Sequence, residues 1–216
     1  MLSIPEIREL YNKRARRYDF SANLYYLVGF RENAYRKRAV ASLNLQPGET
    51  VVEIGCGTGL NFQHIQKYIG PTGKIIGVDL TAEMLAIAKR RCQKHHWNNV
   101  ALVEHDASSY EFPDSIDGVV STFALTLIPE YKLVIGHAAD ALSSGKSMVV
   151  LDMKIPDWPR PLINLAVLFT SPFGVSLDIG HRHPWEDMQQ SFGNLQMQEV
   201  YFGGVYLATS VKKHQR

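Results

Sequence analysis

The sequence lacks the features that would indicate a disulfide framework, a metal centre or a membrane span. It has two cysteines in 216 residues, Cys56 and Cys92, and their spacing fits neither a disulfide framework nor a set of metal ligands. No apolar run reaches the roughly 18 residues that a spanning helix needs, and the first residues lack the apolar core of a signal peptide. We therefore expect a cytoplasmic protein without a metal, whose membrane contact, if it has one, is peripheral and on the inner face.

No charge of one sign dominates the chain, but its distribution is uneven. The 23 Lys and Arg face 21 Asp and Glu, and residues 1–38 hold nine of these bases against four of the acids. Within that segment, residues 4–18 have apolar side chains at helical spacing and basic ones mostly on the other faces, which predicts a basic amphipathic helix. Such a helix either covers the domain with a solvated basic face or rests on anionic membrane, where each Lys or Arg contributes about 1 kcal/mol.

Alternating glycines occur in one short stretch, residues 51–61, which has the sequence VVEIGCGTGLN. The β-branched run predicts a strand, the glycines a tight turn, and the residues after them a helix start. Glycine permits positive φ and has no Cβ, so a ligand can lie against this backbone, and the free N–H groups of the helix favour an anion or a carboxylate. Leu60 stands where a dinucleotide-binding turn has its third glycine, so NAD is the weaker candidate.

Strands and helices alternate along the chain. We predict helices over residues 31–43, 61–68, 82–94 (with Thr81 as N-cap), 129–142 and 185–192, and strands over 50–54, 74–79, 100–103, 118–124, 147–153, 195–202 and 205–212. The last two strands meet at Gly203 and Gly204, so they must form an antiparallel hairpin. The pattern predicts an α/β fold: a seven-stranded, doubly wound, Rossmann-like sheet, mostly parallel with an antiparallel terminal hairpin strand, and with ligands at the carboxyl ends of its strands.

Residues 53–59, EIGCGTG, closely resemble motif I of the class I S-adenosylmethionine-dependent methyltransferases, and the similarity continues over the strands and helices that follow. The basic N-terminal segment and residues 180–185, GHRHPW, are most similar to the bacterial phospholipid N-methyltransferases, which convert phosphatidylethanolamine toward phosphatidylcholine, and more distantly to quinone-ring methyltransferases. The resemblance implies S-adenosylmethionine as the cofactor. We expect a helical arm or lid at 1–45 and a Rossmann-like methyltransferase domain at 46–216, with a substrate-cap insert at about 156–184.

The two acids that follow neighbouring strands are the clearest candidate ligands for the cofactor. Asp79 ends the strand at 74–79, where an acid can accept hydrogen bonds from both ribose hydroxyls, and the resemblance implies the same role. It also implies that Asp106 accepts from the adenine amino group, although either acid alone would suit a helix N-cap. The cofactor-binding residues that the resemblance implies are Tyr18, Glu53, Gly55, Gly57, Thr58, Gly59, Asn61, Asp79, Leu80, Met84, Asp106, Ala107 and Thr122.

Their expected roles follow the parts of the cofactor. Leu80 and Met84 would press on the adenine, and the backbone of Ala107 would lie beside it. The helix start at Thr58, Gly59 and Asn61 would face the methionine carboxylate. Glu53 would hold the turn and receive the methionine amine, the end of the strand at Thr122 would pass the methionine portion, and Tyr18 would fold back over the cofactor, unless it serves only in the apolar stripe of its helix.

Methyl transfer from a sulfonium is an in-line displacement, so alignment and exclusion of water supply much of the catalysis. A base is needed only when the acceptor arrives protonated, as an ethanolamine headgroup does. Histidine has a suitable pKa for that role, and a tyrosine face stabilises a cationic amine. The candidate catalytic residues are Tyr11, Tyr25, Tyr26, His105, His181 and His183. His181 and His183 would need a third ligand to bind a metal, and we identify none.

The absence of certain motifs also limits the classes of methyl acceptor that we expect. The chain lacks the N-P-P-Y or D-P-P-Y run of enzymes that methylate nucleic-acid amino groups, so we expect no nucleic-acid partner. The basic arm and the apolar segment 162–175 flank the predicted cofactor site and favour a lipid-like acceptor, unless the segment simply fills the core. Three functions stay open: a phosphatidylethanolamine N-methyltransferase at the membrane surface, a methyltransferase for a quinone-type or other small-molecule acceptor, and a cofactor-binding protein without turnover.

Overall fold

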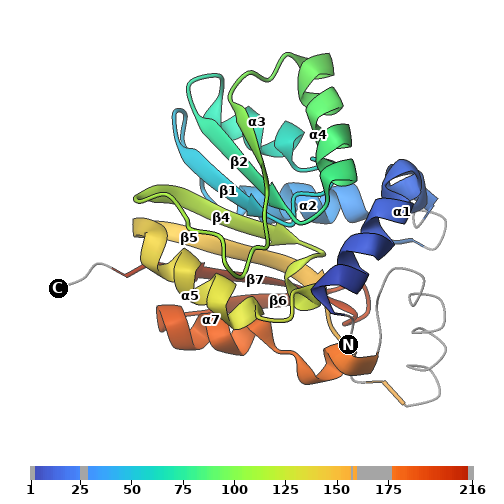
Figure 1. The fold of residues 1–216 in the computed structure, drawn as a ribbon. Helices are drawn as coiled ribbons and strands as arrows, with labels where there is room; N and C mark the ends of the chain where they lie inside the picture. Colours follow the sequence, from blue (N-terminus) through green and yellow to red (C-terminus); the bar gives the residue numbers. More distant parts are fainter. Residues whose placement is uncertain (1–2, 25–28, 157, 160–176, 214–216) are drawn as a thin grey trace.

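A computed structural model describes residues 3–24, 29–156, 158–159 and 177–213, and the side chains of these residues except 16–24 and 177–178. The described residues form one seven-stranded sheet covered by helices (Figure 1). The strands are β1 Thr50–Ile54, β2 Lys74–Asp79, β3 Val100–Glu104, β4 Ile116–Thr122, β5 Leu142–Met153, β6 Gln196–Val200 and β7 Val205–Val211. The α-helices are α1 Ile4–Leu24, α2 Glu32–Ala41, α3 Phe62–Ile69, α4 Ala82–His95, α5 Tyr131–Ala141 and α7 Pro184–Phe192.

The order of the strands determines where a ligand can bind. It runs β3-β2-β1-β4-β5-β7-β6, and β1 to β5 are parallel while β7 is antiparallel to both of its neighbours. This confirms the predicted fold class. The register sets Ile54 beside Val78 and Ser121, so the carboxyl ends of the three central strands are level. The strand order reverses between β1 and β4, which is where such sheets form a crevice for ligands.

Two hydrophobic clusters fill the two sides of the sheet. Successive strand side chains point to opposite faces. Val51 therefore belongs to the cluster that includes residues of α2, α3 and α4, and Val52 belongs to the cluster that includes residues of α5 and α7. Both valines are fully buried. The near-continuous apolar run of β1 therefore reflects burial on both faces, and it fixes the position at which the glycine turn leaves the sheet.

The element bounds differ from the predicted ones for local reasons. The helix predicted over 4–18 continues to Leu24. β4 ends at Thr122 rather than at residue 124, because Phe123 has a φ of 56° and so leaves the extended region. β5 begins directly after α5, and an irregularity in its register lets Leu142 pair with Ile116 at the start of β4.

Some predictions concern parts of the chain that lie outside the described residues. These are Tyr25, Tyr26, the side chain of Tyr18, and the apolar segment 162–175 with most of the expected insert. In the described part of the chain, no helix combines the length and the apolar character that crossing a membrane requires.

Candidate functional site

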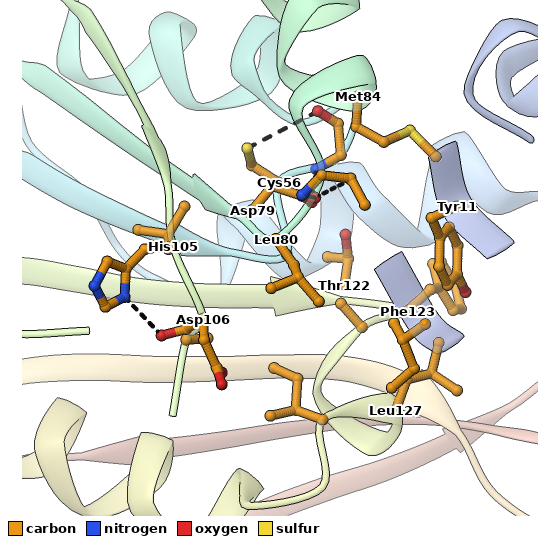
Figure 2. Close-up of a pocket in the computed structure, with 18 of the residues that line it drawn as sticks. Tyr11, Cys56, Asp79, Leu80, Met84, His105, Asp106, Thr122, Phe123 and Leu127 are labelled. Atoms are coloured by element: carbon orange, nitrogen blue, oxygen red, sulfur yellow. Dashed lines mark hydrogen bonds between the residues drawn. The ribbon is translucent and has the colours of Figure 1, made fainter. Parts of the chain in front are cut away.

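A cleft opens at the carboxyl ends of β1, β2 and β4, at the point where the strand order reverses. The turn after β1, the end of β2, the loops after β3 and β4, one side chain of α2 and the first turns of α1 form its walls. Figure 2 shows Asp79 and Leu80 between two groups of side chains, with His105 and Asp106 on one side and Tyr11, Phe123 and Leu127 on the other. The predicted site residues that line the cleft are Tyr11, Gly55, Gly57, Thr58, Asp79, Leu80, Met84, His105, Asp106, Ala107 and Thr122.

The three glycines of the turn serve different purposes. A Cβ on Gly55 would lie 2.3 Å from the Cβ of Ala124, so this glycine lets the turn contact the loop after β4. A Cβ on Gly59 would lie 2.6 Å from the Phe62 ring, so that glycine allows α3 to pack close to the turn. Gly57 lines the cleft, and a Cβ there would meet nothing within 4 Å. Its backbone is open to the cleft, and the expected contact with the cofactor stays a prediction.

Asp79 is fixed at the centre of the cleft by hydrogen bonds from the backbone on both sides. Its Oδ2 accepts from the Gly57 N–H at 2.7 Å, and its Oδ1 accepts from the N–H of Thr81 at 3.0 Å and from the Thr81 hydroxyl. Thr81 is the N-cap residue of α4, as predicted, but its hydroxyl bonds to Asp79 rather than capping the helix. Burial raises the pKa of Asp79, while these hydrogen bonds oppose the rise. A carboxylate oriented in this way suits a ribose, and that role stays a prediction.

The residues that the sequence analysis expects beside an adenine all line the cleft. Met84 and Ala107 are buried, and Leu80 lines the cleft with them. The Oδ1 of Asp106 accepts from the N–H and the hydroxyl of Ser108, both at 2.9 Å, which orients the carboxylate. His105 is exposed and its Nδ1 lies 2.9 Å from the carbonyl oxygen of Asp106. An apolar slot edged by one oriented acid can hold a flat ring that carries an amino donor.

Behind the turn lies a buried polar network that the sequence indicates only in part. The Asn61 side-chain amide donates to Glu53 Oε1 and to Thr122 Oγ1, both at 2.8 Å, so it joins β1, α3 and β4. Glu53 is 1% exposed, and burial raises its pKa to about 8 even though the Asn61 hydrogen bond and the charge of Arg36 lower it. Its second oxygen is buried without a hydrogen-bond partner among the described residues. Glu53, Gly59 and Asn61 thus support the turn from behind and do not line the cleft.

Arg36 of α2 is a cleft residue that the sequence analysis missed. It is 5% exposed, lines the cleft, and pairs with Glu32 Oε1 at 2.6 Å. Its guanidinium also donates to the Thr122 hydroxyl and lies 5.1 Å from the centre of the Phe123 ring. A buried guanidinium at a ligand cleft is a natural partner for a carboxylate. The spacing of Glu32 and Arg36, four residues apart on a helix, was the available signal.

The wall on the far side from Asp106 is apolar. Its residues come from α1, from the end of β4 and from the loop after it: Ile4, Ile7, Tyr11, Phe123, Ala124, Leu127, Ile128 and Pro129. The apolar stripe of the predicted N-terminal helix therefore covers the cleft, and α1 packs against α4.

A second buried polar group holds this apolar wall in place. Asp152, at the end of β5, is 3% exposed and accepts a hydrogen bond from the Thr126 N–H at 2.8 Å. Burial raises the pKa of Asp152 to about 6, against the hydrogen bonds and the charge of Arg182. Arg182 donates to the carbonyl oxygens of Ile128 and Pro129. The loop that forms the wall is thus fixed from β5 and from the segment before α7.

The two histidines before α7 lie apart from the cleft wall. His183 Nε2 lies 3.1 Å from the Gly180 carbonyl oxygen and its Nδ1 lies 3.2 Å from Glu186 Oε1, while His181 is exposed. Among the described residues that line the cleft, neither histidine occurs, and Arg182 between them contacts the wall instead. No group of three or more His, Cys, Asp and Glu suited to a metal ion occurs in the described ranges.

The chain is similar in sequence to known methyltransferases. Residues 51–145 match the family described as "Methyltransferase domain". The chain is 27% identical over 193 residues to a demethylmenaquinone methyltransferase of Staphylococcus saprophyticus. The aligned region covers 88% of this chain and 81% of that protein. A demethylmenaquinone methyltransferase of Staphylococcus aureus matches at the same identity and covers 88% of this chain and 78% of its own length.

Solved structures share the fold. Phosphoethanolamine N-methyltransferase 2 of Haemonchus contortus, in complex with phosphomonomethylethanolamine and S-adenosylhomocysteine, superposes with a TM-score of 0.72 at 15% identity and covers 99% of this chain and 61% of that chain. A SAM-dependent methyltransferase from Aquifex aeolicus superposes with a TM-score of 0.56 at 16% identity and covers 81% of this chain and 88% of that chain. At these identities the likeness is one of fold.

Proposed function

We propose that this chain, which is an S-adenosylmethionine-dependent methyltransferase, methylates the amine of phosphatidylethanolamine and of its partly methylated forms at the membrane surface. The observation that carries the proposal is the apolar wall that α1 and the loop after β4 form beside the cofactor residues. A soluble polar acceptor would gain nothing from such a wall, whereas an amphiphilic acceptor can lay apolar groups against it.

S-adenosylmethionine is the cofactor, and it supplies the methyl group on a sulfonium. The described residues fit it: the backbone at Gly57 is open to the cleft, and Glu53 carries a buried oxygen without a hydrogen-bond partner in the described part of the chain. We assign Asp79 to the ribose, Asp106 to the adenine amino group, and Arg36 to the methionine carboxylate, because each of these side chains lines the cleft with its orientation fixed by hydrogen bonds.

The apolar wall does two things for the reaction. The side chains of α1 exclude water from the cleft, and Tyr11 and Phe123 present aromatic faces on the same side (Figure 2). Aromatic faces attract a cationic amine and the quaternary product of repeated methylation. The ammonium must lose a proton before its lone pair attacks. Of the candidate catalytic residues that line the cleft, Tyr11 lies on the side of the apolar wall, whereas His105 lies on the opposite side beside Asp106 (Figure 2).

A quinone-type ring is the second candidate acceptor, and a specific observation favours it. The demethylmenaquinone methyltransferases of Staphylococcus align with 88% of this chain, so the similarity includes segments outside the shared cofactor core. An apolar wall would suit the prenyl tail of such a ring as well as it suits acyl chains. The two candidates differ in the atom that is methylated, which is nitrogen in one and ring carbon in the other.

The test offers both acceptors to the full chain. Phosphatidylethanolamine vesicles and detergent-dispersed demethylmenaquinone are incubated with isotope-labelled cofactor, and the lipid extract is analysed by mass spectrometry. We expect label in mono-, di- and trimethylated phosphatidylethanolamine. Label in the quinone alone would replace the first candidate by the second, and an unlabelled extract would refute both.

A pair of variants tests the wall itself. Ile7 lines the cleft, while its neighbour Arg8 is exposed. Ile7→Ser should lower turnover of the lipid with little change in cofactor affinity, whereas Arg8→Ser should retain turnover. Equal effects of the two substitutions would contradict a role for the wall in binding the acceptor.

A further inference from the structure

The turn between β6 and β7 is built from residues that are unfavourable for its shape. Tyr201, Phe202 and Gly203 have φ values of 49°, 57° and 81°, so three consecutive residues are left-handed. Turns of this kind favour Gly, Asn and Asp, because a bulky side chain is strained at positive φ. Phe202 is nevertheless a large aromatic residue and is 77% exposed. Folding of the hairpin does not account for a phenylalanine at this position.

An unbroken series of aromatic rings leads from this turn to the cofactor cleft. The ring centre of Phe202 lies 5.5 Å from that of Tyr201, Tyr201 lies 4.9 Å from Phe30, and Phe30 lies 5.7 Å from Phe123. Phe123 lines the cleft beside the apolar wall. The exposed tip is therefore connected by direct packing to the place where we expect the acceptor.

Exposed cations lie next to the same aromatic series. Arg31 follows Phe30 in the chain and is exposed, and the exposed Arg38 donates a hydrogen bond to Gln198 of β6. No ion pair joins either arginine to an acid within the ranges that the structure describes. An exposed aromatic side chain beside uncompensated cations is the combination that binds the headgroup region of an anionic bilayer.

The apolar face of α1 is not available for this contact. Ile4, Ile7 and Tyr11 line the cleft, so they face the domain rather than the solvent. A bilayer therefore needs an apolar anchor from another part of the surface, and Phe202 is more exposed than the other large apolar side chains that the structure describes.

We propose that the β6–β7 turn is a membrane anchor, in which Phe202 inserts among the lipids of an anionic bilayer while Arg31 and Arg38 contact the headgroups. The anchor holds the outer end of the aromatic series at the bilayer surface, so that a lipid headgroup has a short path to the cleft. This inference rests on the proposed lipid acceptor, but it is tested by binding rather than by turnover.

Vesicle flotation of the full chain, with no methyl transfer involved, is the direct test. The vesicles contain phosphatidylethanolamine with phosphatidylglycerol, and a parallel set contains uncharged lipid only. Phe202→Asn removes the apolar side chain and puts in a residue that tolerates left-handed φ, so the fold should be retained, as thermal unfolding will verify. At limiting lipid, we expect the partition coefficient of Phe202→Asn to be lower than that of the parent chain by a factor of about ten or more. Tyr68→Asn is the matched control, because Tyr68 is an exposed aromatic in the last turn of α3, at the other end of the sheet.

A second pair of variants tests the charges independently of the turn. The double variant Arg31→Gln and Arg38→Gln should lose the preference for anionic over uncharged vesicles. The double variant Lys67→Gln and Lys94→Gln, which removes two exposed cations from α3 and α4, should keep it. If Phe202→Asn floats like the parent chain, or if the parent chain does not bind anionic vesicles, the anchor is refuted.

Turnover separates this inference from the proposed acceptor. Binding that depends on Phe202, without methylation of phosphatidylethanolamine, would support the anchor and refute the acceptor. Equal methylation of short-chain, monomeric phosphatidylethanolamine by the parent chain and Phe202→Asn, together with unchanged flotation of the variant, would support the proposed acceptor and refute the anchor.

Discussion

Replacing Glu53 by Gln should stabilise the protein without cofactor and weaken its binding of cofactor. Glu53 is 1% exposed, and burial raises its pKa from an ordinary 4.5 to about 8. Between these two pH values the unfolded chain gives up the proton and the folded chain retains it, so stability falls as pH rises through this window. At pH 7 the difference amounts to about 3 kcal/mol, at roughly 1.36 kcal/mol per pH unit. Glutamine does not titrate, so the variant should gain about this much at pH 7 and nothing near pH 4.

The same proton should leave when the cofactor binds. Glu53 does not line the cleft, so we predict that the methionine amine reaches its unpartnered oxygen through the turn, directly or through a water. Such a contact favours the ionised carboxylate, so binding at pH 7 should release up to about 0.9 proton. Calorimetry in phosphate and in Tris, whose ionisation enthalpies differ, measures this release directly. Glu53→Gln should abolish it and weaken cofactor binding by about 1.5–3 kcal/mol, the value of a hydrogen bond to a charged group.

Glu83→Gln is the control, since Glu83 is exposed in the first turn of α4. It should leave proton release and the pH dependence of stability as they are in the parent. Binding enthalpies of the parent chain that are identical in the two buffers would refute the assignment of the amine to Glu53. A flat dependence of its stability on pH between 4.5 and 8 would refute the proton on the buried carboxyl.

We make three further predictions, for substitutions of cleft residues Asp79, Arg36 and Gly55. Asp79→Ala should weaken cofactor binding by about 1–3 kcal/mol, because hydrogen bonds to a charged acceptor are lost, and unchanged affinity in calorimetry would mean that the ribose lies elsewhere. Arg36→Met should cost about 3–5 kcal/mol of stability, because it leaves Glu32 buried and unpaired; adding Glu32→Gln should restore stability in chemical denaturation but not cofactor affinity. Gly55→Ala should cost about 1–3 kcal/mol, because its Cβ would lie 2.3 Å from a neighbouring Cβ, whereas Gly136→Ala in α5, where a Cβ meets nothing within 4 Å, should raise stability by about 0.5–1 kcal/mol in the same assay.

Local patterns were sufficient to predict the architecture. A few adjacent residues are enough to predict the strand β1, the glycine turn after it and the hairpin at Gly203-Gly204. The order of the elements then allows few topologies. The acids at the ends of β2 and β3 could be placed on the cleft for the same reason, because parallel strands bring their carboxyl ends to one edge.

Contacts between distant segments could not be predicted in this way. Arg36 reaches Thr122 across 86 positions of sequence. The spacing of Glu32 and Arg36 indicates an ion pair along one helix, but it does not indicate that this helix packs over the cleft. Arg182 likewise contacts the carbonyl oxygen of Ile128, 54 positions away. The sequence analysis instead selected the histidines on either side of Arg182, because an imidazole has a suitable pKa for a base. Side-chain function at the cleft depends on which helix packs over it, and that is a property of the tertiary structure.

The position of β7 between β5 and β6 has a consequence for synthesis on the ribosome. β5 and β6 are both made before β7, yet neither pairs with the other, so β5 presents an open edge until β7 has left the exit tunnel. Open edges of this kind attract other chains. A nascent chain stalled before Val205 should therefore be a client for chaperones, and overexpression at high translation rates should yield aggregates that slower translation at lower temperature avoids.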